Sequence, residues 1–139
     1  MKVVYKYNNV DLKTYGVSVA RGKGFLGVPQ RKKPKVYEYP EHNGYAVDLS
    51  VPVYEARKIT LDCFITANSA IQLASMYNAF TKAMLNVTDT VPFGVFINNS
   101  QVFSGKVFTE SVSELNKTFE HGKNVGTFTL TIIEPEPTI

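Results

Sequence analysis

The chain has 139 residues, of which 44% are hydrophobic and 19% are charged, as in a globular protein that can build a core of its own. It contains no apolar run of about 20 residues, the length that a membrane span needs, and residues 1–7 lack the apolar block of a signal peptide. Its single cysteine, Cys63, cannot form an internal disulfide. We therefore expect one domain, residues 1–139, made in a reducing cytosol.

The net charge of +3 is unevenly distributed along the chain. Residues 1–58 contain 11 of the 15 lysines and arginines and five of the 12 acids, a net charge of +6. Residues 59–139 contain four bases and seven acids, a net charge of −3. Such asymmetry suits binding to a nucleic acid or an anionic surface, and it equally suits head-to-tail contact between copies of the chain.

The first 19 residues predict two short strands around a turn. Apolar and polar residues alternate in residues 3–7, and an apolar rhythm resumes in residues 10–19. Asn8 and Asn9 separate the two segments, and asparagine tolerates the positive φ that tight hairpin turns require.

Residues 20–35, ARGKGFLGVPQRKKPK, predict a long basic loop because three glycines and two prolines interrupt any regular element. A loop of this length within a compact domain is usually functional or disordered. We favour an arm that contacts a neighbouring subunit. One alternative is a solvated loop. The other is a nucleic-acid-binding β-barrel that uses a basic arm, residues 21–35, to bind a phosphate backbone. The candidate interface residues are Arg21, Lys23, Phe25, Arg31, Lys32, Lys33 and Lys35.

Residues 36–39 and 45–53 predict a second hairpin, with a turn at residues 40–44. Apolar residues occupy every second position of residues 45–53, as in a half-buried strand. Pro52 cannot donate to a ladder, so it indicates a sheet edge or the end of pairing.

Residues 57–85 predict a strand followed by a helix, and we expect the rest of the fold to pack against them. Residues 58–65 alternate with a period of two, with Ile59, Cys63 and their alternating neighbours on the apolar face. Ser69 is the expected N-cap of a helix over residues 69–85, which ends at Asn86. Residues at spacings of three and four form the expected apolar stripe: Ala70, Leu73, Tyr77, Phe80 and Met84.

The remaining residues predict two more pairs of strands. Residues 93–97 and 101–106 form a hairpin around Asn98 and Asn99, and residues 107–115 pair with residues 125–133 through a polar connection. About eight strands and one helix predict a mainly β fold, a β-sandwich or partly closed barrel of about eight strands with one flanking α-helix.

The sequence contains few residues in patterns that suit catalysis or metal binding. His42 and His121 stand in turn-like polar segments without metal-ligand spacing, so we expect solvated residues; a hydrolase or lectin-like site around either histidine is the alternative. Gly22, Gly24 and Gly27 match the letters of a dinucleotide fingerprint, but no buried strand precedes them and no helix is expected after them. We therefore expect no enzyme, no metal, no cofactor and no small-molecule substrate.

The order of several short segments resembles the N-terminal domain of siphophage distal tail proteins, over roughly residues 5–133. The segments are residues 9–19 (NVDLKTYGVSV), the basic stretch of residues 20–35, residues 44–49 (GYAVDL) and residues 54–61 (YEARKITL), which lead into the helix. The resemblance implies a fold similar to phage tail tube proteins, a β-sandwich with one flanking helix, in which residues 20–35 occupy the place of an inter-subunit loop.

The resemblance also implies a function. Such domains assemble as hexameric rings whose sheets line a channel through which DNA passes, beside other tail proteins such as the tube, tail-tip and tape-measure proteins. We therefore expect a virion structural protein of a phage or prophage tail, in the tube or baseplate hub, made in the bacterial cytoplasm. Many distal tail proteins continue into a carbohydrate-binding-like domain, whereas this sequence ends at Ile139, so we expect a bare ring or adaptor.

Overall fold

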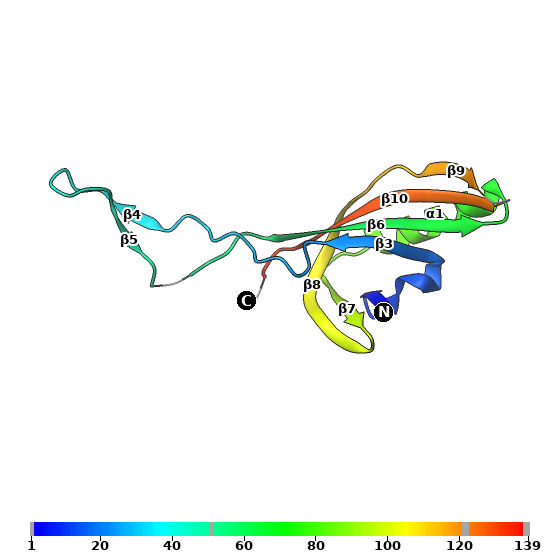
Figure 1. Cartoon of the computed structure of the whole chain (residues 1–139), viewed down its shortest axis with the longest axis horizontal. Helices are drawn as coiled ribbons and strands as arrows, with labels where there is room; N and C mark the ends of the chain where they lie inside the picture. Colours follow the sequence, from blue (N-terminus) through cyan, green and yellow to red (C-terminus); the bar gives the residue numbers. More distant parts are fainter. Residues whose placement is uncertain (1, 51, 121–122, 138–139) are drawn as a thin grey trace.

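The structure, a computed structural model, describes residues 2–50, 52–120 and 123–137. It is mainly β, with one α-helix and one short 3-10 helix. Two parts are evident in Figure 1: a body, which contains the helix and most strands, and a thin arm that projects from it. The elements are β1 (Val3–Tyr7), β2 (Val10–Asp11), η1 (Leu12–Tyr15), β3 (Val17–Lys23), β4 (Lys35–Tyr37), β5 (Ala46–Asp48), β6 (Arg57–Ala67), α1 (Ala70–Leu85), β7 (Val91–Ile97), β8 (Ser100–Val112), β9 (Asn116–Glu120) and β10 (Lys123–Glu134).

The body is built from one eight-stranded antiparallel sheet with the order β2-β1-β7-β8-β10-β6-β3, and β9 pairs with β10. The long strand β8 belongs to both halves of the sheet, because it pairs with β7 through its first half and with β10 through its second. Buried side chains from both halves join in one apolar core. The predicted mainly β fold of about eight strands with one flanking helix is thereby confirmed.

Strand β6 lies near the centre of this core, as its alternation predicts. Ile59, Cys63 and the apolar residues between and beyond them are buried, whereas Lys58 and Thr66 on the opposite face are exposed. β6 pairs with β10 over its whole length and with β3 on its other side. An 11-residue strand hydrogen-bonded on both sides is a rigid support for the chain that leads out of it.

Helix α1 begins and ends where the sequence predicts. The Ser69 hydroxyl accepts a hydrogen bond from the Gln72 amide (3.1 Å), and the Gln72 side chain accepts one from the Asn68 amide (3.0 Å). The Asn86 N–H donates to the Lys82 carbonyl and closes the last turn. Leu73, Phe80 and Met84 are buried and Tyr77 is half-buried. Ala70, expected in the same stripe, is the first residue of the helix and is exposed. No helix in the described residues is long and apolar enough to cross a membrane.

Both Asn-Asn turns form as predicted, with positive φ at Asn8, Asn9, Asn98 and Asn99. Other boundaries differ from the prediction. Leu12–Tyr15 is a 3-10 helix rather than strand, residues 101–106 and 107–112 belong to the single strand β8, and the expected polar connection contains β9. β9 was missed because an edge strand in contact with solvent does not need apolar alternation.

The hairpin predicted over residues 36–53 forms, since β4 pairs antiparallel with β5, but its position in the fold differs from the prediction. We expected it to contribute strands to the sandwich, and this is wrong: β4 and β5 form a separate two-stranded sheet in the arm. The expected loop over residues 20–35 is shorter as well. Its first residues, through Lys23, continue β3, and Lys35 opens β4. In the structure, most of the predicted loop and the predicted hairpin together form the projecting arm.

Candidate assembly surface

The arm, residues 26–56, is a long ribbon of two chain segments that run side by side away from the body (Figure 1). At its base, the Glu55 N–H donates to the Gln30 carbonyl (2.7 Å) and the Lys32 N–H donates to the Val53 carbonyl (2.9 Å). Further out, β4 pairs with β5. The chain reverses at the tip, where Gly44 adopts a positive φ of 71°.

The root of the arm is fixed in the body. Phe25 is only 9% exposed and packs edge-on against the rings of Tyr5 and Phe103, with centroid distances of 6.2 and 6.4 Å. Gly24 has a φ of 98°, and a side chain there would collide with the backbone carbonyl of Lys58. Phe25 therefore belongs to the core of its own subunit, because its ring packs on Tyr5 of β1 and Phe103 of β8.

On the return side, Arg57 is the first residue of β6 and Glu134 is the last residue of β10, and the two are paired in register. Their side chains, 12% and 3% exposed, form an ion pair with 3.1 Å between Nη1 of Arg57 and Oε1 of Glu134. The guanidinium also lies 5.2 Å from the ring centroid of Phe103. Both ends of the arm are thus joined to residues that core contacts hold in place.

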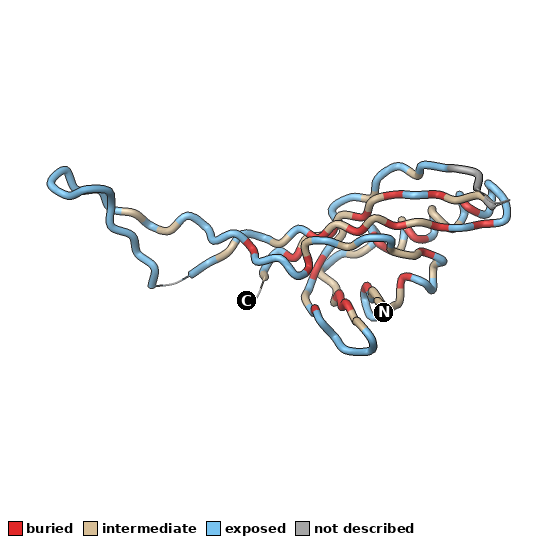
Figure 2. Tube along the Cα trace, viewed as in Figure 1, coloured by how far each residue is buried: buried red, intermediate tan, exposed pale blue. Residues whose placement is uncertain are grey.

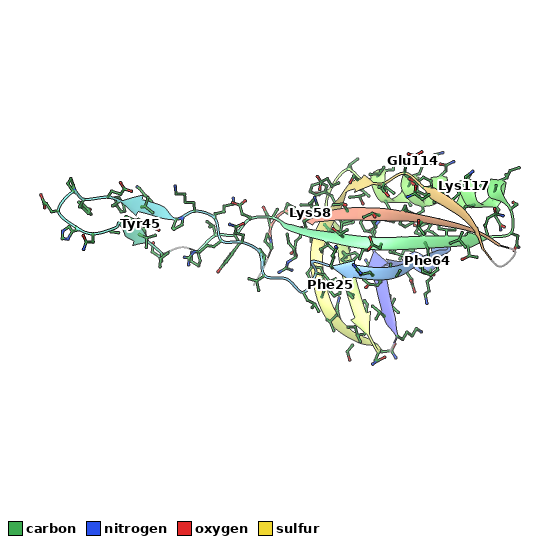
Figure 3. All side chains as sticks on the ribbon, turned by 45° about the horizontal axis from the view of Figure 1, so that its top comes forward. Phe25, Tyr45, Lys58, Phe64, Glu114 and Lys117 are labelled. Carbon is green, nitrogen blue, oxygen red and sulfur yellow. The ribbon has the colours of Figure 1, made fainter. Side chains whose placement is uncertain are left out.

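Beyond its root the arm is almost entirely exposed (Figure 2). Eight of its large apolar side chains are exposed: Leu26, Val28, Tyr37, Tyr39, Tyr45, Val47, Leu49 and Val53. Figure 3 places Tyr45 far out on the ribbon and Phe25 at the body. A two-stranded hairpin without packing is at best marginally stable in water, and exposed apolar side chains in such number mark an interaction surface. The isolated subunit leaves this arm without the packing that would hold it in one conformation.

The charges of the arm balance. Arg31, Lys32, Lys33 and Lys35 are all exposed. The arm also contains four acids: Glu38, Glu41, Asp48 and Glu55. Lys35 is directly opposite Asp48 in the β4–β5 register, and its ammonium lies 5.5 Å from the ring centroid of Tyr37. A surface that tracks a phosphate backbone needs an excess of positive charge, whereas a neutral, apolar arm suits a protein partner.

The remaining predicted interface residues, Arg21 and Lys23, lie on β3 in the body, opposite Asp62 and Thr60 of β6. The sequence prediction missed the apolar residues of the returning segment as interface candidates, although their alternation was visible. Alternation alone does not say whether the apolar face packs on the subunit's own sheet or on another chain.

The residues that the sequence singled out for chemistry are scattered in the structure. No group of three or more metal-ligating side chains occurs among the described residues. His42 lies in the exposed tip, with its ring 6.1 Å from that of Tyr39, and His121 lies outside the described residues. Burial raises the pKa of the Cys63 thiol to about 12, so it remains protonated and unreactive at neutral pH. Gly22 and Gly24 lie at the end of β3 and at the arm root, with no helix following.

No protein-family model matches the sequence. A comparison with curated proteins also finds no match. Among solved structures, the chain is similar to the SPP1 Dit (gp 19.1) protein, a paradigm of the hub adsorption apparatus in Gram-positive infecting phages, with a TM-score of 0.65 and 14% identity. The two chains share a fold. The match covers 99% of this chain and 53% of that one, so this chain spans about half the length of SPP1 Dit.

Proposed function

We propose that this protein is a structural subunit of a phage or prophage tail, a hub or tube-like ring component that acts by assembly with copies of itself. The arm carries the proposal: residues 26–56 expose eight large apolar side chains, and most of the arm beyond its root is exposed. The shared fold with SPP1 Dit, a protein of a phage hub, supports the tail role. The partners are then other copies, neighbouring tail proteins, and DNA as passing cargo.

The uneven charge supports head-to-tail contact. Residues 1–58 have a net charge of +6, all of it outside the neutral arm, and residues 59–139 have a net charge of −3. In a ring, each subunit contacts the next through the same two surfaces. Oppositely charged surfaces would therefore meet at every interface of the closed assembly. A hexamer is the size that the resemblance to distal tail proteins implies, and the protein would then reside in the virion.

Removal of the arm tests this function. The Glu55 amide is hydrogen-bonded to the Gln30 carbonyl, so residues 31–54 can be replaced by a two-residue Gly-Gly turn without displacing either end. The shortened protein should unfold cooperatively and remain monomeric at concentrations where the parent assembles. An oligomer of unchanged mass would refute the arm as the assembly element.

The second candidate function is nucleic-acid binding through Arg31, Lys32, Lys33 and Lys35, which are exposed within five residues of one another. It predicts that a monomer binds single-stranded DNA with an affinity that falls steeply as salt increases. Fluorescence anisotropy at several salt concentrations distinguishes the two, because the assembly function predicts no tight binding by the monomer.

A further inference from the structure

Two strand edges of the body face each other without pairing. β1 pairs with β7 over its whole length, but on its other side it pairs with β2 only at Lys6 and Tyr7. β3 pairs with β6 on one side only. Within the described residues no ladder joins β1 to β3, so the sheet is open along this line. Unpaired edges expose backbone N–H and C=O groups that can accept another strand.

A groove with a volume of about 280 Å³ lies between these edges. Leu12 and Val17 are buried at its apolar floor, and Val3, Tyr5 and Val19 are partly exposed along its sides. The other lining residues are polar and include one acid and one base, Asp11 and Lys13. The groove therefore offers strand edges and apolar contacts without a net charge. We call it the edge groove.

We propose that the edge groove receives the returning segment of the arm, residues 46–50, from a second copy of the chain. This inference rests on the proposed function, since it names where the arm docks. Val47 and Leu49 are exposed and alternate with polar residues, so both point to one side of an extended segment. Within the part of the chain that the structure describes, β5 pairs with β4 on one side only. The segment thus supplies the backbone edge and the apolar side chains that the edge groove can accept.

The geometry requires the segment to come from another copy. The arm projects away from the body, and β5 lies well out along it, so residues 46–50 do not lie against the body of their own subunit (Figure 1). Each leg of the arm has about 15 residues, which extend about 50 Å at roughly 3.3 Å per residue. Such a leg can cross to an adjacent subunit. The neutral arm also matches the neutral edge groove, whereas a strongly basic arm would not.

Cross-linking between two variants, each with one introduced cysteine, tests the contact. Leu49→Cys with a mass tag and untagged Val3→Cys are mixed, allowed to assemble, and treated with a short bis-maleimide. Cys63 is buried and does not compete. A tagged–untagged dimer is expected. The matched control is Val102→Cys, an exposed position on β8 outside the edge groove. Equal yields from Val3→Cys and Val102→Cys, or no dimer from Val3→Cys, would overturn the proposal.

A charge in the edge groove gives a second test. Val3→Asp should raise the concentration at the midpoint of assembly at least about tenfold, equivalent to about 1.4 kcal/mol, while Val102→Asp leaves it unchanged. Thermal unfolding of both variants checks that they fold. If Val3→Asp assembles normally while arm removal abolishes assembly, the edge groove is wrong and the proposed function stands. If arm removal has no effect, the proposed function itself fails.

Discussion

Arg57 and Glu134 form a buried ion pair, 3.1 Å between Nη1 and Oε1, at the point where the arm rejoins the body. Arg57→Met removes the charge but keeps much of the side-chain length, and it leaves the Glu134 carboxylate buried without its partner. Breaking a buried pair in this way costs about 3–5 kcal/mol of unfolding free energy. Urea unfolding at pH 7 measures the loss. Lys58→Met, one residue away on the exposed face of β6, is the control and should change stability little.

The same carboxyl makes stability depend on pH. Burial raises the pKa of Glu134, and the nearby Arg57 lowers it by less. Because the folded pKa lies above the unfolded value, the stabilisation is fully present below the unfolded pKa, about 4.3 for glutamate, and is lost as the pH rises through the folded pKa. The stability of the parent relative to Glu134→Gln should therefore fall as the pH rises above the unfolded value. A stability difference between the parent and Glu134→Gln that rises with pH would contradict this prediction. Glu136→Gln, at an exposed position, is the control.

Phe80 holds α1 to the sheet. Its ring is fully buried, with centroids 5.9 Å from Tyr15 and 5.4 Å from Phe128. Phe80→Ala should lower the unfolding free energy by about 3–5 kcal/mol, because it removes buried apolar contact and leaves a cavity. Ile71→Ala on the same helix is the matched control, since Ile71 is 82% exposed. Equal losses from the two variants in thermal or urea unfolding would show that the helix face is misassigned.

Gly24 sets the direction in which the arm leaves the body. Its φ of 98° is rare for other residues, and a side chain there would meet the backbone of Lys58. Gly24→Ala should destabilise the protein by about 1–3 kcal/mol and weaken assembly, because relief of the clash displaces the arm root. Gly27→Ala, where a side chain meets only an ordinary contact with the Gly24 carbonyl, should be close to neutral. Calorimetry and light scattering on both variants check the two effects.

The basic run of the arm should contribute to assembly, because without it the four acids of the arm would leave it with a net charge of −4 instead of neutral. Replacing Arg31, Lys32, Lys33 and Lys35 together by Ser is expected to weaken oligomerisation without changing the melting temperature of the monomer, since all four are exposed. The matched control replaces four exposed lysines of the body by Ser: Lys2, Lys82, Lys106 and Lys117. Both sets remove four positive charges. Equal weakening by both sets would mean that total charge, rather than the arm, governs association.

Much of the body could be predicted because its signals are local. Ser69 and Gln72 cap a helix through contacts within four residues, and the alternation of β6 records its buried face directly. The Asn-Asn turns follow from the tolerance of asparagine for positive φ. These features depend on neighbouring residues, so a single sequence is enough to find them.

The arm could be predicted only in part. Its basic half was identified as an interface candidate from its glycines, prolines and charges. Its returning half was misplaced in the sandwich, because Val47 and Leu49 alternate whether they face their own sheet or another chain. Phe25 was assigned to the arm, since its position among glycines gave no indication that its ring reaches Tyr5 and Phe103. Such contacts depend on the complete fold.

The mass of the protein in solution tests the central claim most directly. Light scattering after size exclusion, over a range of protein and salt concentrations, should give a closed oligomer of defined mass that dissociates on dilution. The variant with residues 31–54 removed, measured in parallel, should remain a monomer. A parent protein that stays monomeric at every concentration and salt would contradict assembly through the arm.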